Sequence, residues 1–343
     1  MSLTDERSSN FGLSLSSLRA LSRSRLFPII ACTISATSIA DCAAQSYPSK
    51  VVRIVVPVAA GGPTDILARA VAQKLTEAWN QQVVVDTRPG GGSNIGFEIV
   101  AKSAPDGYTL LMAQPALTVN VSLYKNLAYD PVRDFAPISL ATTHPLLLLA
   151  HPSVPVHNVK ELVTLAKAKP GQLNIGSAGN GTTPHLAAAW FNTVAGVRIT
   201  HVPYKGASLA VIDLLGGHTD LSFASPTAVI TYIRDNRLKP LAMTTPTRYH
   251  LLPELPTFVE SGYPEFVVMG WYGLLAPAGT PREIISRINA DTNKALATND
   301  MKERLNALGE DPVGTSPEQF SAWIKDEVTR WAKVVKAAGA KVD

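Results

Sequence analysis

The chain has 343 residues, of which 46% are hydrophobic, and this is enough apolar material for sizeable buried cores. Its formal net charge of +4 is small, and no basic run is interleaved with aromatic residues, which argues against nucleic acid as a partner. After the first 44 residues no apolar run is long enough for a membrane span, so we expect none there.

The first 44 residues predict an export signal rather than part of the fold. Arginines precede the apolar segment 26–40, and Ala43 and Ala44 supply the small residues of a cleavage site. We therefore expect residues 1–44 to be a signal peptide that is cleaved near Ala44, and the mature protein to be periplasmic. An organellar transit peptide, which the acidic residues near the start disfavour, and a lipid anchor at Cys42 are the alternatives.

A strand followed by a glycine turn opens the part of the chain that we expect to fold. Residues 51–56 form an apolar, β-branched run that is broken only by Arg53 and is typical of a buried strand. Pro57 ends this strand, because proline cannot donate to a sheet. Gly61 and Gly62 follow, and glycine allows backbone conformations that are closed to other residues.

The same turn leads into a helix that can bind an anion. Thr64 or Asp65 can cap this helix, and its apolar positions continue on one face as far as Trp79. The first N–H groups of a helix have no partner inside it, and its dipole is positive there. The turn therefore predicts a site for an oxyanion or a carboxylate, with an ordinary strand–helix turn as the alternative.

Strand and helix patterns alternate along the rest of the chain. Strands are expected at 83–85, 109–113, 146–150, 173–176, 198–202, 221–224, 238–244 and 267–275. Helices are expected to end near 103, 169, 194, 215 and 235, and the last helices to begin near 281, 300 and 316. The segment 114–137 is expected to be irregular.

This alternation predicts an α/β fold in which mostly parallel sheets are flanked by helices. The chain is expected to cross into a second lobe near 146–150 and to return near 238–244. Residues 45–147 and 243–343 would then form the first lobe, and residues 148–242 the second.

A second glycine turn, residues 176–183, also lies between a strand and a helix. Thr182 and Thr183 stand near the expected helix cap, and His185 follows just inside the helix. Ligands of open α/β sheets bind at the carboxyl ends of the strands, so two such turns in two lobes can face one cleft, which favours the anion-binding interpretation. For His185, ligand binding and a local bond within its own helix are equally open.

The sequence contains no catalytic or metal-binding pattern that we consider convincing. Ile175 stands where a nucleophile elbow around Ser177 would need glycine, and the seven histidines lack the spacing of a zinc site. Both cysteines, Cys32 and Cys42, lie in the leader, so the mature chain would have no disulfide and no thiol nucleophile. We therefore expect a protein that is not an enzyme and that uses no cofactor or metal.

Ordered sequence motifs cover nearly the whole chain from Tyr47 onward. They include YPSKVVRIVVPVAAGGPTD from Tyr47, TRPGGGSNIG from Thr87, LAKAKPGQLNIGSAGNGTTPHLA from Leu165, HVPYKGA from His201 and WYGLLAPAGTP from Trp271. In this set of motifs the chain resembles the Bug-type extracytoplasmic solute-binding proteins of tripartite tricarboxylate transporters.

The resemblance implies a two-lobed periplasmic binding fold of type II, with the ligand cleft between the lobes. It also implies that residues 59–65 and 180–183 hold a carboxylate, largely through main-chain N–H groups and bridging waters. Further cleft-lining positions follow from the resemblance at 114, 120, 204, 205 and 224–226. The candidate ligand-binding residues are then Val58, Ala59, Gly61, Gly62, Thr64, Asp65, Gln114, Asn120, Asn180, Gly181, Thr182, Thr183, His185, Tyr204, Lys205, Ala224, Ser225 and Pro226.

Two positions depart from the family pattern. Val58 stands where many members have an aromatic residue, and Ala224 stands where many have an aspartate. An acid at the second position can meet an amino group, so Ala224 weakens the case for an amino-acid ligand. It leaves room for a carboxylate with an apolar body.

The resemblance implies a periplasmic protein that delivers a small organic anion to the membrane permease subunits of a tripartite tricarboxylate transporter, and we expect this protein to be a monomer. The anion would be a di- or tricarboxylate or an aromatic carboxylate. A sensor that presents its carboxylate to a receptor kinase is one alternative, because both roles use the same closed surface. A hydrolase in the same cleft is a further alternative that no catalytic constellation supports.

Overall fold

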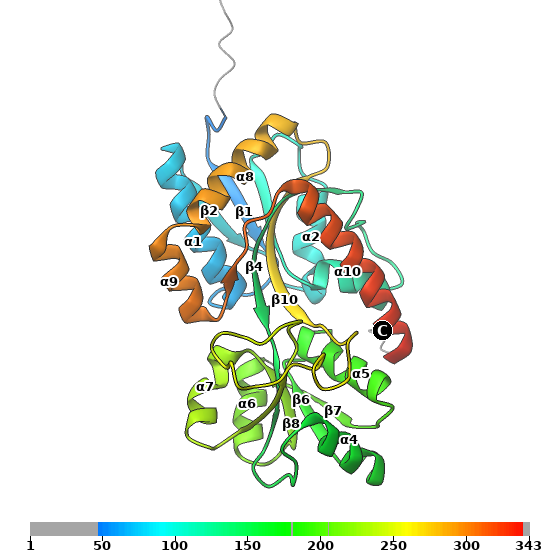
Figure 1. Cartoon of the computed structure of the whole chain (residues 1–343). Helices are drawn as coiled ribbons and strands as arrows, with labels where there is room; N and C mark the ends of the chain where they lie inside the picture. Colours follow the sequence, from blue (N-terminus) through cyan, green and yellow to red (C-terminus); the bar gives the residue numbers. More distant parts are fainter. Residues whose placement is uncertain (1–46, 180, 205, 339–343) are drawn as a thin grey trace, which may run out of the picture. The chain divides into compact units, whose positions relative to one another are not determined.

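The computed structural model describes residues 47–338, apart from residues 180 and 205. The expected signal peptide, residues 1–44, therefore lies outside the described residues. Residues 45–343 group into one compact unit, which contains two β-sheets with helices packed on them (Figure 1). Among the described residues, no helix has both the length and the apolar character that crossing a membrane requires.

The first sheet has the strand order β11-β4-β10-β3-β1-β2. Its strands are β1 (Val52–Val56), β2 (Val83–Thr87), β3 (Thr109–Ala113), β4 (Phe135–Pro145), β10 (Met269–Pro277) and β11 (Asp311–Pro312). Strands β1, β2 and β3 are parallel, whereas β10 runs antiparallel to both β3 and β4. Its helices and one 3₁₀ turn are α1 (Pro63–Trp79), η1 (Gly91–Ser93), α2 (Asn94–Ala101), α3 (Ala116–Leu123), α8 (Arg282–Leu296), α9 (Asn299–Leu308) and α10 (Pro317–Ala338).

Helices cover both faces of this sheet because its central strands are apolar on both sides. Ile54 of β1 packs in one cluster with Leu67 and Leu75 of α1. The next residue, Val55, points to the opposite face and packs with Phe97 of α2. The β-branched run of β1, interrupted only by the partly buried Arg53, is therefore covered from both sides, as the strand pattern in the sequence indicates.

The second sheet has the order β7-β6-β8-β5-β9, in which β6, β7 and β8 are parallel and β5 is antiparallel to its neighbours. Its strands are β5 (Leu147–Ala150), β6 (Asn174–Ser177), β7 (Thr200–Pro203), β8 (Leu221–Ala224) and β9 (Lys239–Met243). Its helices are α4 (Val159–Ala168), α5 (Thr183–Ala195), α6 (Ala207–Leu215) and α7 (Pro226–Arg234). Leu148 packs with Phe191 of α5 on one face, and Leu149 packs with Leu214 of α6 on the other.

The chain passes between the two sheets at two adjacent places. β4 leads into β5 across Leu146, and residues 244–268 lead from β9 to β10. The Leu146 N–H donates to the Thr244 hydroxyl oxygen at 3.0 Å, and the Thr244 N–H donates to the Leu146 carbonyl at 2.9 Å. The Thr244 hydroxyl donates in turn to the Val268 carbonyl at 2.6 Å. Buried Thr244 thus ties the crossing segments together; the division of the chain into lobes at 147–148 and 242–243 stays a prediction.

The expectation that 114–137 is irregular was wrong, because this segment contains α3 and the start of β4. α3 is mostly buried and has no charged face, so its sequence lacks the periodicity of an amphipathic helix. In β4, Pro137 and Pro145 disfavour a strand. The first lies beside a register irregularity opposite Leu275 and the second ends the strand, so both are tolerated.

Candidate functional site

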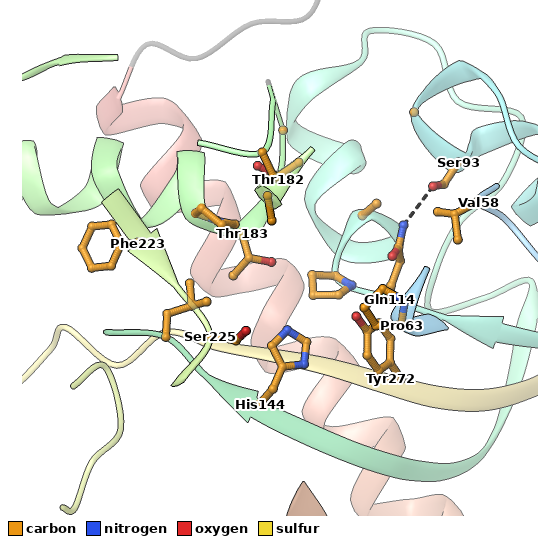
Figure 2. Close-up of a pocket in the computed structure, with 18 of the residues that line it drawn as sticks. Val58, Pro63, Ser93, Gln114, His144, Thr182, Thr183, Phe223, Ser225 and Tyr272 are labelled. Atoms are coloured by element: carbon orange, nitrogen blue, oxygen red, sulfur yellow. Dashed lines mark hydrogen bonds between the residues drawn. The ribbon is translucent and has the colours of Figure 1, made fainter. Parts of the chain in front are cut away.

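A cavity of about 490 Å³ opens between residues of the two sheets (Figure 2). Its walls come from the segment after β1, from η1 and α3, from the start of α5, and from the end of β8. The crossing strands contribute His144 and Tyr272. This volume lies within the range of sites for small molecules.

The structure brings part of the candidate set together around the cavity. Its walls include the candidates Val58, Gln114, Asn120, Gly181, Thr182, Thr183, Ala224 and Ser225. Other candidates lie away from the cavity wall, namely Ala59, Gly61, Gly62, Thr64, Asp65, His185, Tyr204 and Pro226. Asn180 and Lys205 fall outside the described residues. The ligand-binding role of every candidate stays a prediction.

Many wall residues were not anticipated from the sequence. They are Gly92, Ser93, Pro115, Ala116, Leu123, Tyr124, His144, Leu146, Ala178, Pro184, Ala207, Phe223, Leu308 and Glu310. Pro63, which also lines the cavity, lies in the expected segment 59–65. Gly92 and Ser93 belong to a third glycine turn, which follows the parallel strand β2. Ligands bind at the carboxyl ends of such strands, so this position could have indicated a wall residue. His144 and Glu310 carried no such signal, because only strand pairing brings them together.

The first glycine turn is closed by a side chain of its own helix. α1 begins at Pro63 with Gly62 as its N-cap, so the expectation that Thr64 or Asp65 caps the helix was wrong. Asp65 instead accepts hydrogen bonds from the Gly61 N–H at 2.9 Å and from Arg69 Nε at 3.0 Å.

The Asp65 carboxylate is almost completely buried and remains charged. Burial acts to raise its pKa, but the bonds from Arg69 and Gly61 outweigh burial and hold the pKa below its usual value. A carboxylate of the chain itself therefore lies at the positive end of α1, where a bound anion would otherwise be stabilised.

A chain of hydrogen bonds fixes the cavity wall next to α1. The Thr64 hydroxyl donates to Gln114 Oε1 at 3.3 Å, and Gln114 Nε2 donates to Ser93 Oγ at 3.0 Å (Figure 2). The side-chain amide of Asn120 donates to the Gly92 carbonyl at 2.9 Å and to Asn94 Oδ1 at 2.7 Å. The side chains of Gln114 and Asn120 thus hold the third glycine turn in place.

The second glycine turn faces the cavity more directly than the first. α5 begins at Thr183 with Thr182 as its N-cap, as expected, and Gly181 has a φ of +77° that favours glycine. The Thr182 hydroxyl donates to the Gly179 carbonyl at 2.7 Å. The Thr183 side chain makes no hydrogen bond to another described residue, and Figure 2 shows it at the cavity, on the side of Ser225.

His185 makes a local bond and lies away from the main cavity wall. Its Nδ1 accepts from the Gly181 N–H at 3.0 Å, so this nitrogen carries no proton. Its ring stacks on His201 with 4.2 Å between the ring centres, and His201 Nε2 lies 2.6 Å from Ser177 Oγ. Burial lowers the pKa of His185, and burial together with the His185 ring lowers the pKa of His201 to about 4.

Of the remaining candidates of the second lobe, Tyr204 is bonded locally and Ser225 is exposed to the cavity. The Tyr204 hydroxyl donates to Asp213 Oδ2 at 2.5 Å, and burial together with this carboxylate raises the pKa of Tyr204 to about 12. Ser225 caps α7, and Pro226 occupies its first turn. Ser225 makes no side-chain cap bond within the described helix, so its hydroxyl is available at the cavity wall.

One histidine–carboxylate pair lies in the cavity wall. Glu310 is buried and accepts from the Thr142 hydroxyl at 2.8 Å, while His144 Nδ1 lies 3.2 Å from the same carboxylate. The Tyr272 ring packs beside His144, with 5.2 Å between the ring centres. Over the described part of the chain, no lysine or arginine lines the cavity, and no acidic, histidine or cysteine side chains gather in a group that could hold a metal ion.

Known proteins are similar to this chain over most of its length. The sequence profile described as "Tripartite tricarboxylate transporter family receptor" matches residues 67–340. Protein BugT of Bordetella pertussis is 37% identical over 325 residues, which cover 94% of this chain and 100% of BugT.

Solved structures share the fold. A protein from R. palustris with adipate is 36% identical and superimposes with a TM-score of 0.75, covering 86% of this chain and 100% of the other. MatC from Rhodopseudomonas palustris with bound malate is 32% identical, with a TM-score of 0.72, and covers 84% of this chain and 100% of the other. The expected fold, with two helix-flanked sheets and the Bug-type family, is thereby confirmed.

Proposed function

The chain belongs to the tripartite tricarboxylate transporter receptor family, and from that premise we propose that it captures a small organic acid in the periplasm and delivers it to a membrane permease. Family members and neighbours are solute-binding proteins rather than enzymes. The proposed ligand is a di- or tricarboxylate or an aromatic carboxylate.

The N-terminus of α5 carries this proposal. Gly181, Thr182 and Thr183 all line the cavity. The N–H groups of Gly181 and Thr182 are bonded within the turn, so the Thr183 N–H and hydroxyl, together with the helix dipole, are what favours a negative charge there. Ser225 adds a hydroxyl at the start of α7. A carboxylate can therefore bind through neutral donors, without a salt bridge to a lysine or arginine of the described cavity wall. The adipate and malate complexes of the two relatives support the same chemistry.

The charge of the ligand is tested with matched pairs of acid and amide. We expect an acid found by thermal-shift screening to bind at least about tenfold more tightly than its carboxamide, a difference of roughly 1.4 kcal/mol. Isothermal titration calorimetry on both compounds measures the ratio. Equal affinities for acid and amide would contradict the proposal.

Export and transport are tested separately. N-terminal sequencing of the protein from a periplasmic fraction is expected to begin at or near Gln45. Uptake of the identified acid should require both this chain and a tripartite permease, and light scattering should give the mass of a monomer. Retention of the whole leader in the cytosol would contradict the periplasmic location.

A further inference from the structure

We propose that Glu310 and His144 select among acids: they favour a ligand whose second polar group donates a hydrogen bond, a hydroxyl or an ammonium, over one with a second carboxylate. The inference rests on the proposed function, because the first carboxylate is assigned to the N-terminus of α5. It concerns what the other end of the same ligand meets, and it narrows the proposed ligand class from di- and tricarboxylates toward acids with one carboxylate, aromatic acids among them.

Glu310 reaches the cavity from the segment between α9 and β11. β11 pairs with β4 at Thr142 and Thr143, which brings the Glu310 side chain to the wall that His144 also lines. The side chain of Glu310 is 4% exposed and that of His144 is 15% exposed, so each presents only a small part of its surface to the cavity, where water screens charge poorly. In Figure 2 the His144 ring projects into the cavity beside Tyr272.

The carboxylate of Glu310 retains acceptor capacity toward a ligand. A carboxylate offers about four acceptor positions. The Thr142 hydroxyl and His144 Nδ1 account for the described contacts of this side chain, which leaves positions for a donor in the cavity. An unpaired buried acceptor is costly, so a ligand donor at this place would be bound selectively.

A second carboxylate would meet unfavourable charge at the same place. Within the described wall, no lysine or arginine is present to balance Glu310 and a ligand carboxylate together. Like charges in a site that is poorly screened by water repel strongly, and such repulsion is an effective source of specificity.

The competing explanation is that Glu310 only fastens β11 to β4. The substitution Glu310→Gln separates the two, because the amide keeps an acceptor for Thr142 while it removes the charge. Asp311→Asn is the matched control: it removes a carboxylate at the next position, which bonds to the Tyr249 hydroxyl and lies away from the cavity wall. Melting curves establish that both variants are folded.

The probes are matched in shape and differ at one end. Adipate, 6-hydroxyhexanoate and 6-aminohexanoate form an aliphatic set, and terephthalate and 4-hydroxybenzoate form an aromatic one. Wild-type protein is expected to bind the hydroxyl or ammonium acid of one set at least about tenfold more tightly than the corresponding diacid. Glu310→Gln should abolish this preference, mainly by tightening the diacid, while Asp311→Asn should preserve it.

The results that overturn the inference are distinct from those that overturn the proposed function. If wild-type protein prefers the diacid in both sets, acids still bind and only the inference fails. A Glu310→Gln variant that weakens every probe by the same factor shows that the residue is structural. If no acid of either set binds, the inference fails, and the comparison of the screened acid with its carboxamide decides the proposed function separately. The wild-type preference decides the matter even if Glu310→Gln does not fold.

Discussion

The two glycine turns share one pattern of bonds but differ in charge. In each turn a glycine with positive φ, Gly61 at +85° and Gly181 at +77°, donates its N–H to the side chain four residues later. That side chain is the third residue of the helix in both cases, Asp65 in α1 and His185 in α5. The two turns thus share this backbone arrangement, whereas the accepting group differs.

The difference in accepting group determines which helix end is available to a ligand. Asp65 places a carboxylate, paired with Arg69, at the N-terminus of α1. His185 places an uncharged imidazole at the N-terminus of α5. A ligand carboxylate should therefore be held mainly by the second turn, where the dipole is not already matched by a negative side chain.

The largest effect is expected when the second turn is given a negative charge at the cavity. Thr183→Asp places a carboxylate where the ligand carboxylate should lie, and we expect affinity to fall at least about a hundredfold, or 2.7 kcal/mol. Thr183→Asn, which is similar in size and neutral, is the control. An acid in the first turn of a helix is favourable, so the melting temperature of the free protein should not fall. Equal affinities of the two variants would place the carboxylate elsewhere.

Changing the side chain that accepts the glycine N–H should change carboxylate affinity by a smaller factor, downward in the second turn and upward in the first. His185→Asp turns the second turn into a copy of the first, and carboxylate affinity should fall about tenfold because the new charge is one turn away from the cavity. Asp65→Asn keeps an acceptor for Gly61 but removes the charge, so affinity should rise a few-fold while the protein loses roughly 1 kcal/mol of stability.

Calorimetry on both variants, with His185→Asn as the neutral control, measures this exchange. His185→Asn can still accept from the Gly181 N–H and should bind like the wild type. If His185→Asp binds as tightly as His185→Asn, the charge of the accepting group does not control the site, and the two turns are equivalent for a ligand.

Sequence reasoning located both turns but could not distinguish them. The β-branched run before Gly61 and the strand before Gly181 are local signals, and the glycines follow them directly. Whether Asp65 caps its helix or bonds to Gly61 depends on backbone angles that the sequence does not specify, because an acid suits both positions.

The acidic part of the cavity wall was beyond local patterns altogether. His144 and Glu310 are 166 positions apart, and they meet because β11 pairs with β4. β4 itself was not expected, since its prolines argue against a strand. The half of the site proposed to bind the anion was therefore predictable from local sequence, whereas the half proposed to select the ligand depends on tertiary contacts.

Lowering the pH should weaken the bonds around the second turn before those of the first turn. A histidine in the unfolded chain binds its proton near pH 6.5, whereas the folded chain holds the pKa of His201 at about 4. Between these values the unfolded chain binds more protons, so the free energy of unfolding should fall as the pH is lowered from 6.5 to 4. We expect a loss of about 1 kcal/mol, less than for a fully buried ring because part of the ring is exposed.

Urea unfolding at several pH values compares the wild type with His201→Gln, whose amide can still bond to Ser177. The variant should lose less stability over this range. The pKa of Asp65 is below its usual value, so its bond to Gly61 should persist to lower pH. Identical pH profiles for the two proteins would show that His201 does not titrate as described.

The smallest effect is expected at Gly62, which the comparison of the turns separates from its neighbour. Gly62 has a φ of −80°, which any residue adopts, and a Cβ there would meet only the Ala59 carbonyl oxygen, at 3.8 Å. Gly62→Ser should therefore bind ligand within about twofold of the wild type. Its hydroxyl can accept from the first helical N–H groups, so stability should rise by a few tenths of a kcal/mol.

Gly61→Ala is the matched control for the backbone. A Cβ at Gly61 would meet nothing within 4 Å, yet its φ of +85° strains any residue with a side chain. We expect this change to cost about 1 kcal/mol of stability, while affinity stays unchanged in the folded protein because Gly61 lies off the cavity wall. Calorimetry and urea unfolding of both variants test these expectations. If Gly62→Ser abolishes binding in a well-folded protein, the first turn contacts the ligand directly, and the assignment of the carboxylate to the second turn alone is wrong.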